Sequence, residues 1–178
     1  MDVEPPPHLP LPSCKAQPPV AHGKVFGVMG TGKDLPQFVG PPCWEVTPAD
    51  FTKFLEELHA FVPHGFVLCL EGVAASEIEH YLEARPGPFE NETNQGFLKL
   101  RPKIFFMPIT ADSLHGLASL SKSFAEPEVC SHLRIYHDET IILSWHDLPT
   151  DPFYVTTTIS EVALRRFCDA IGSQYGSM

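Results

Sequence analysis

Residues 131–147, SHLRIYHDETIILSWHD, predict a β-hairpin, and residues 151–155, DPFYV, predict a further strand soon after it. The two hairpin strands, about His132–Tyr136 and Thr140–His146, are rich in β-branched and aromatic residues and flank a tight turn at Asp138-Glu139. Strands joined by such short turns pair antiparallel. We therefore expect the C-terminal part of the chain to contain an antiparallel meander.

Before the hairpin, predicted strands and helices alternate. Thr47 suits the N-cap of a first helix, with Pro48 at its first position. The helix would bury one apolar face, formed by Phe51, Phe54, Leu55, Leu58, Phe61 and Val62. The apolar run Phe66–Leu70 follows as a buried strand. An earlier strand is predicted over Lys24–Met29, and a long irregular connector joins it to the first helix.

The remaining elements are placed by capping residues and apolar runs. Ser76 and Glu79 have the spacing of a capping box and predict a second, shorter helix. A buried strand is expected at 103–107, and a third helix at about 111–124. The last helix would begin after Ser160 and end at Gly172.

This order predicts an α/β domain with two or three layers around one mixed sheet, about four helices and α+β character at the C-terminal end. Residues 23–178 would form this single globular domain. Residues 1–22 hold seven prolines and predict an extended or disordered arm, with recognition by an aromatic groove as the alternative.

Composition favours the cytoplasm. Asp2 and Glu4 occupy the place of a basic signal-peptide region, and no apolar run is long enough to span a membrane. The 5 cysteines are odd in number, widely spaced and never in a Cys-x-x-Cys pair, which does not favour a disulfide framework. We expect no membrane association, no metal and no cofactor.

Charge is segregated along the chain. The formal net charge is −10, and between Asp34 and Glu92 only Lys53 and Arg85 oppose 11 acidic residues. An acidic surface repels phosphate, so generic nucleic-acid binding is not expected. It would attract a basic partner, or serve only to keep the protein solvated.

Three motifs resemble known functional signatures, but each is incomplete. Gly27–Asp34 has phosphate-loop spacing, but Asp34 replaces the Mg²⁺-binding hydroxyl and Pro36 prevents the following helix. Glu77 and His80 have carboxylate–histidine metal spacing without a second such pair. Cys130 lies two residues from His132, which allows a thiolate assisted by that histidine, but a lone adjacency is weak evidence for a nucleophile.

The hairpin holds the best candidates for catalysis, which are His132, His146, Asp147 and Asp151. Regular pairing from the turn would place His132 directly opposite Trp145 and leave His146 near Ser131. A histidine there could act as a general base oriented by Asp147 or Asp151. The alternative is a polar strand end that caps loop backbone.

The leading hypothesis is a non-enzymatic, acidic cytoplasmic domain that binds a basic protein, as an inhibitor or immunity protein would. Interface energy is usually concentrated in Trp, Tyr and Arg. The predicted contact residues are therefore Glu56, Glu57, Glu77, Glu83, Arg134, Tyr136 and Trp145. The alternative is a small hydrolase that uses the hairpin histidines. A subunit of a larger assembly would fit the same binding features.

Overall fold

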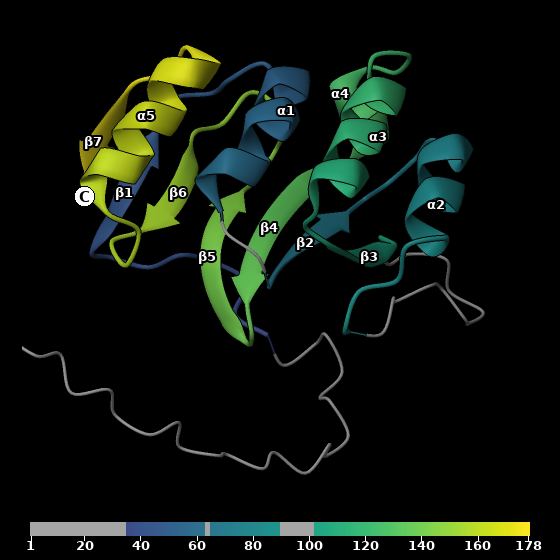
Figure 1. Ribbon diagram of the computed structural model, residues 1–178, viewed down its shortest axis with the longest axis horizontal. Coiled ribbons are helices and arrows are strands. Elements are labelled where there is room, and N and C mark those ends of the chain that lie inside the picture. The colour runs from purple at the N-terminus through teal and green to yellow at the C-terminus, as the bar shows by residue number, and fades with distance from the viewer. Residues whose placement is uncertain (1–34, 63–64, 90–101) are drawn as a thin grey trace, which may run out of the picture.

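The strands of the computed structural model form one sheet, which has helices on one of its faces (Figure 1). The structure describes residues 35–62, 65–89 and 102–178. The strand Lys24–Met29 and the arm 1–22, both predicted, lie outside them. The strands are β1 (Cys43–Val46), β2 (Phe66–Glu71), β3 (Ile104–Pro108), β4 (His132–His137), β5 (Thr140–Trp145), β6 (Phe153–Thr156) and β7 (Tyr175–Ser177).

The helices cover the sheet in the spatial order α5, α1, α3, α2, with α4 at one end of α3 (Figure 1). They are α1 (Phe51–Phe61), α2 (Ser76–Glu83), α3 (Ala111–Ser121), α4 (Glu126–Val129) and α5 (Glu161–Ile171). Five described helices replace the predicted four, because the short α4 precedes the hairpin. None of the described helices has the length and apolar content that crossing a bilayer requires.

The sheet is entirely antiparallel, so the predicted mixed sheet is wrong. Its order is β3-β2-β4-β5-β6-β1-β7. The connections through α3–α4 and through α5 join strands that run parallel, but another strand is inserted between them, whereas β2 and β3, which α2 connects, are adjacent and antiparallel. β2 lies between β3 and β4, and β1 lies between β6 and β7. A sequence shows that a helix connects two strands, but it does not show which strand fills the gap between them.

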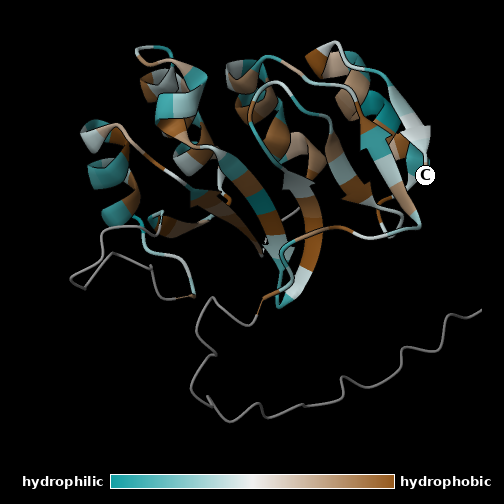
Figure 2. Ribbon diagram, turned by 180° about the vertical axis from the view of Figure 1, so that it is seen from behind, coloured by the Kyte–Doolittle hydropathy of each residue, from teal (hydrophilic) through white to brown (hydrophobic). Residues whose placement is uncertain are grey.

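The main core fills the space between the helices and the sheet. Phe54 of α1 lies near its centre, with ring centroids 5.1 Å from Trp145, 5.5 Å from Phe153 and 5.5 Å from Phe167. All four side chains are buried. Figure 2 shows hydrophobic residues along the strands and hydrophilic residues on the outer faces of the helices. Burial of aromatic side chains at these separations accounts for the apolar face predicted for α1.

A second apolar cluster lies on the helix-free face of the sheet. Its side chains from the sheet are Val67, Cys69, Phe106, Tyr136 and Ile141. Two loop residues, Leu35 and Phe89, complete it, and Val39 packs against it. A loop segment therefore covers apolar side chains that the helices do not reach.

Two predicted helix starts are wrong. Thr47 is bonded to Gln174 through its backbone and its hydroxyl, and thereby extends the pairing of β1 with β7. Asp50 caps α1 instead, with its carboxylate accepting from the Lys53 amide at 2.8 Å. Ser76 is already inside α2, which has no side-chain cap. The caps of α5 at Ser160 and Gly172 are confirmed.

The short outer strands β1 and β7 were not predicted. β1 lies in the region expected to be an irregular connector, directly after Pro41 and Pro42, and β7 contains a glycine. Each has few residues, so its local pattern is weak and pairing with a neighbour defines it.

Candidate functional site

A β-bulge in the hairpin brings two histidines together. The turn at Asp138-Glu139 and the pairing of His137 with Thr140 are confirmed. Beyond Tyr136 the register shifts by one residue, so Leu133, and not His132, lies opposite Trp145. Ile142 and Leu143 both enter the main core, which accommodates the extra residue. As a result the rings of His132 and His146 lie 5.0 Å apart at the open end of the hairpin.

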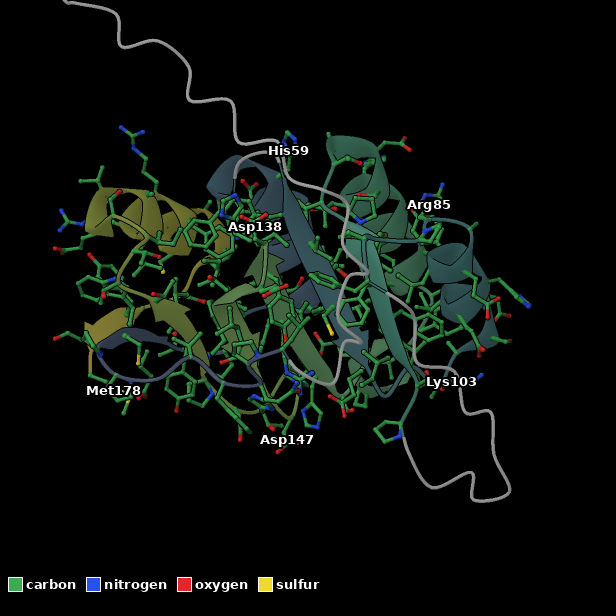
Figure 3. All side chains as sticks on the ribbon, turned by 90° about the horizontal axis from the view of Figure 1, so that it is seen from below. His59, Arg85, Lys103, Asp138, Asp147 and Met178 are labelled. Carbon is green, nitrogen blue, oxygen red and sulfur yellow. The ribbon has the colours of Figure 1, made fainter. Side chains whose placement is uncertain are left out.

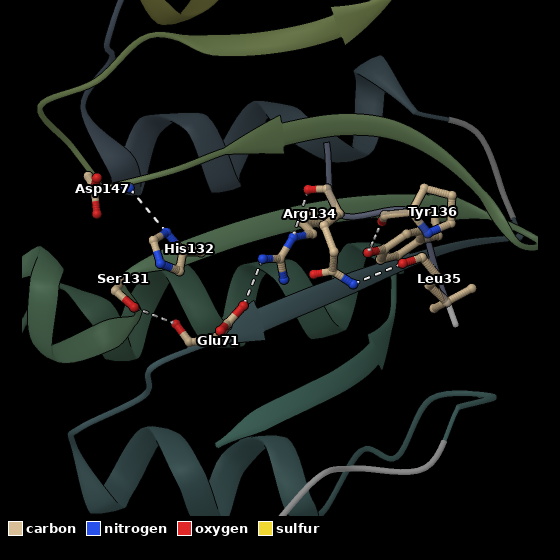
Figure 4. A network of polar contacts seen from close by, with 9 residues as sticks. Leu35, Glu71, Ser131, His132, Arg134, Tyr136 and Asp147 are labelled. Atoms are coloured by element: carbon tan, nitrogen blue, oxygen red, sulfur yellow. Dashed lines mark hydrogen bonds and ion pairs between the residues drawn. The ribbon is translucent and has the colours of Figure 1, made fainter. Parts of the chain in front are cut away.

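His132 is held by backbone, not by a carboxylate. The amide of Asp147 donates to its Nδ1 at 3.2 Å (Figure 4), and Asp147 adopts a positive φ of 50°. Because Nδ1 accepts, neutral His132 carries its proton on Nε2 and has no free lone pair there. His132 is therefore not arranged as a general base, and the carboxylate of Asp147 does not orient it through this bond.

His146 is the more unusual of the two histidines. Its ring stacks on Phe38, with centroids 4.6 Å apart and planes 26° apart. Among the described residues, its buried Nε2 has no hydrogen-bond partner. Burial, and then the positive charge of Arg134 and the neighbouring His132, lower the pKa of His146 below its ordinary value. Its imidazole is therefore neutral at neutral pH.

Beside the histidines lies a buried ion pair between neighbouring strands. Arg134 of β4 contacts Glu71 at the end of β2 at 2.7 Å, and their side chains are 6% and 16% exposed. The Nε of Arg134 also donates to the carbonyl of Gln37 at 3.1 Å (Figure 4). A buried charge needs such partners, so Arg134 has a structural role inside the protein.

Residues 35–39, which we call the strap, are attached to this face by several contacts. The Tyr136 hydroxyl donates to the carbonyl of Pro36 at 2.8 Å, and the amide of Val39 donates to the Ser144 hydroxyl at 3.2 Å. The Arg134 bond to Gln37 and the stacking of Phe38 on His146 lie between them in the chain. The polar groups of the sheet thus hold a connector in place.

The candidate hydrolase residues are only partly brought together. His132 and His146 are adjacent, whereas the side chains of Asp147 and Asp151 are exposed. Asp151 contributes its backbone carbonyl, which accepts from the Trp145 indole at 2.8 Å. Asp138, at the turn, lies across the molecule from Asp147 (Figure 3).

The hydroxyl groups near the histidines are already engaged. Ser144 accepts from Val39, and Ser131 donates to the backbone carbonyl of Glu71. An open pocket occurs elsewhere, along β7, lined by Glu45, Thr47, Gln174 and residues 175–178. Within the described ranges no three His, Cys, Asp or Glu side chains gather in a way that could hold a metal ion. The cluster contains a possible base, His146, but no described nucleophile poised beside it.

Cys130 is not an activated thiol. It lies in the main core with no exposed surface, and burial raises its pKa far above the ordinary value. A buried thiol of this kind stays protonated and behaves as a small hydrophobe.

Three of the predicted contact residues lie inside the protein. Trp145 is 0%, Tyr136 1% and Arg134 5% exposed, so none of them can meet a partner on the surface of this structure. Trp145 belongs to the aromatic core, and the other two hold the strap. A hairpin in the middle of a seven-stranded sheet has both faces covered, which its composition alone does not reveal.

The predicted acidic contact residues lie on two helices that flank α3. Glu56 and Glu57 are on α1, and Glu77 and Glu83 are on α2. Glu56 pairs with Lys122 at 2.9 Å. For Glu57, Glu77 and Glu83, no ion pair with another described residue is formed. The acidic third of the sequence is therefore not one surface, since Glu45 and Glu71 belong to the sheet.

Glu71 and Phe38 are site residues that the sequence reasoning missed. Glu71 ends the apolar run FVLCLE, and Arg134 is the one cation within the strand HLRIYH apart from its histidines. Two isolated opposite charges in buried strands could have suggested an ion pair. Phe38 lies among prolines and glycines and carries no comparable signal.

Comparison with protein-family models, with curated proteins and with solved structures found no significant match, so the site is interpreted from its own geometry.

Proposed function

We propose that this chain is a non-catalytic binding domain that holds a basic protein against the carboxylates of α1 and α2. The observation that carries the proposal is the set of unpaired carboxylates there. Glu77 and Glu83 are exposed and Glu57 is half-buried, and none forms an ion pair with another described residue, although Glu77 accepts from Ser76 and lies near His80. Such carboxylates are free to meet cations of a partner.

The polar groups of the sheet support the same proposal, because they are used within the protein and are not open to a substrate. Arg134, Tyr136 and Ser144 are occupied in holding the strap, and His132 accepts from backbone. An enzyme needs convergent polar groups that remain open to a substrate. In this domain the organised polar groups of the sheet are internal, whereas Glu77 and Glu83 of α2 are exposed.

Exposed charges chiefly affect how fast partners meet. Attraction between α1–α2 carboxylates and a basic surface would steer the encounter, and salt would screen it over about 10 Å. We therefore expect the association rate to fall steeply with ionic strength and the dissociation rate to change less.

The test uses two variants with the same change in charge. In the first, Glu57, Glu77 and Glu83 are changed to Lys; in the control, Glu139, Asp151 and Asp169 are changed to Lys, all exposed and outside α1 and α2. Partners are captured from native lysate at low and high salt, and the association rate of each captured protein is then measured with all three domains.

The proposal expects a basic partner whose association rate is reduced by salt and by the first variant but much less by the control. Equal effects of both variants would indicate only a response to net charge. A rate that does not depend on salt, or no partner at any salt concentration, would refute the electrostatic mechanism.

A second candidate is a small hydrolase in which His146 is the general base. It is favoured by one observation, the approach of His132 and His146 to 5.0 Å. Turnover of a panel of activated esters, lost in His146→Gln and retained in His137→Gln, would support it. Equal turnover by wild type and His146→Gln would exclude His146 as the base.

A further inference from the structure

The strap is a cover whose attachment depends on one titratable side chain. It lies over an apolar part of the helix-free face that includes Val67, Tyr136 and Ile141. Three hydrogen bonds to side chains of β4 and β5 hold its backbone, and Phe38 stacks on His146. Phe38 is 68% exposed, so the ring gains little from burial in the core and contacts the sheet chiefly through the histidine.

Protonation would place a positive charge at His146 in an unfavourable position. From β4 it faces Arg134 and His132, and only Asp147, on its own segment, adds an opposite charge. Glu71 of β2 is already engaged by Arg134, and Tyr154 of β6 lies on the same face, opposite Ser144. The strap contributes Phe38, which carries no charge, and the backbone of Gln37, whose hydrogen bond raises the pKa of His146 but is the smallest of the causes and is outweighed by burial.

We propose that the strap is a proton-sensitive cover, docked on the sheet while His146 is neutral and released when His146 gains a proton. Release removes Phe38 from the histidine and lets water reach its ring. It also uncovers the apolar side chains beneath Leu35 and Val39. The result is an apolar surface that is present only at mildly acidic pH.

The direction of the effect follows from linkage. Burial in the docked state, together with Arg134 and His132, lowers the pKa of His146 from its ordinary value of 6.5. Arg134 and His132 belong to β4 in both states, so the pKa of His146 differs between the states because of the burial that the strap supplies. The undocked state therefore binds the proton more tightly, and docking is strongest above the undocked-state pKa and weakens as the pH falls through that value. The loss ends once the pH is below the docked-state pKa. The total change in the docking equilibrium equals the ratio of the two acid dissociation constants.

The amide of Val39 reports docking directly because it donates to Ser144. Its hydrogen-exchange protection is measured from about pH 7.5 to about pH 5, while the ring resonances of His146 report protonation. We expect protection at Val39 to fall at least about twofold as His146 titrates, with no change at the core amide of Ile109.

Two variants identify the responsible histidine. His146→Gln should abolish the pH dependence. His137→Gln should keep it, and it is closely matched, because His137 stacks on Phe66 at 4.7 Å and 27°. Constant protection at Val39 across the titration of His146, or an unchanged decrease in His146→Gln, would overturn the proposal.

A reciprocal measurement covers the case in which His146→Gln loosens the strap at every pH. The double change Tyr136→Phe and Ser144→Ala removes two strap hydrogen bonds and leaves His146 in place. Because linkage is reciprocal, weaker docking must raise the pKa of His146. An unchanged His146 titration with a strap that has lost its protection would show that the two are not coupled.

Discussion

Removing one partner of the Arg134–Glu71 pair should destabilise the domain far more than removing both. The two groups lie 2.7 Å apart with side chains 6% and 16% exposed, so neither charge is well hydrated. Loss of one partner from a buried pair costs about 3–5 kcal/mol, because the other charge is left uncompensated. Replacement of both by apolar groups of similar size is often nearly neutral.

The two single substitutions should lower the free energy of unfolding for different reasons, because each leaves a different charge without its partner. Glu71→Met leaves the more deeply buried Arg134 charge, so we expect a loss of about 3–5 kcal/mol. Arg134→Met leaves a carboxylate that retains some contact with water, for which about 2–4 kcal/mol is reasonable. It also removes the bond to Gln37, worth about 1 kcal/mol. The double variant leaves no unpaired charge, so its loss of stability comes only from the missing bond to Gln37 and from small packing changes, and should be about 1–2 kcal/mol.

Urea unfolding of the four proteins at neutral pH gives these free energies, provided that the m-values agree. The double-mutant cycle should yield a coupling of at least about 3 kcal/mol. The control cycle uses Glu161 and Arg165 of α5, an exposed i,i+4 pair that should couple by about 0.3–0.5 kcal/mol. Additive single changes at Glu71 and Arg134, or losses as small as in the control, would show that the pair is hydrated and refute the reasoning.

Two further predictions concern the cap of α1 and a core thiol. Asp50→Ala should lower the free energy of unfolding by about 1 kcal/mol, whereas Asp50→Asn should retain most of it, because only the acceptor for the Lys53 amide is essential. Equal losses in thermal or urea unfolding would mean that charge, and not capping, is responsible. Cys130 should react with an aromatic disulfide reagent at mildly alkaline pH only when the protein unfolds, since burial raises its pKa and excludes the reagent. Fast labelling of Cys130 in the native protein, identified by peptide mapping, would contradict its placement in the core.

Local patterns predicted most of the elements. The helical spacing of Phe54, Leu55 and Leu58 and the apolar run that forms β2 both mark segments with a buried side, and such patterns survive in almost any tertiary context. The caps at Ser160 and Gly172 were predictable because each satisfies backbone groups of its own helix. Thr47 was misassigned because it bonds to Gln174, a residue far away in the sequence.

The candidate site was less predictable. Its histidines were recognised, but one extra residue in β5 changed which side chains face each other. A shift of one position exchanges the two faces of a strand, and here it exchanged Trp145 for His146 opposite His132. The bulge is stabilised by burial of both Ile142 and Leu143 under the helices, a property of the packed core.

The sequence by itself determined the secondary structure of the main elements, the hairpin turn and the segregation of acidic residues, because these depend on neighbours within a few positions. Only the tertiary structure decided that every strand pair is antiparallel, that Arg134 meets Glu71 and that the strap crosses the helix-free face. The ion pair and the bonds of Arg134 and Tyr136 to the strap join residues about 60 to 100 positions apart. Which distant groups meet is set by the burial of the whole chain, and no local preference specifies it.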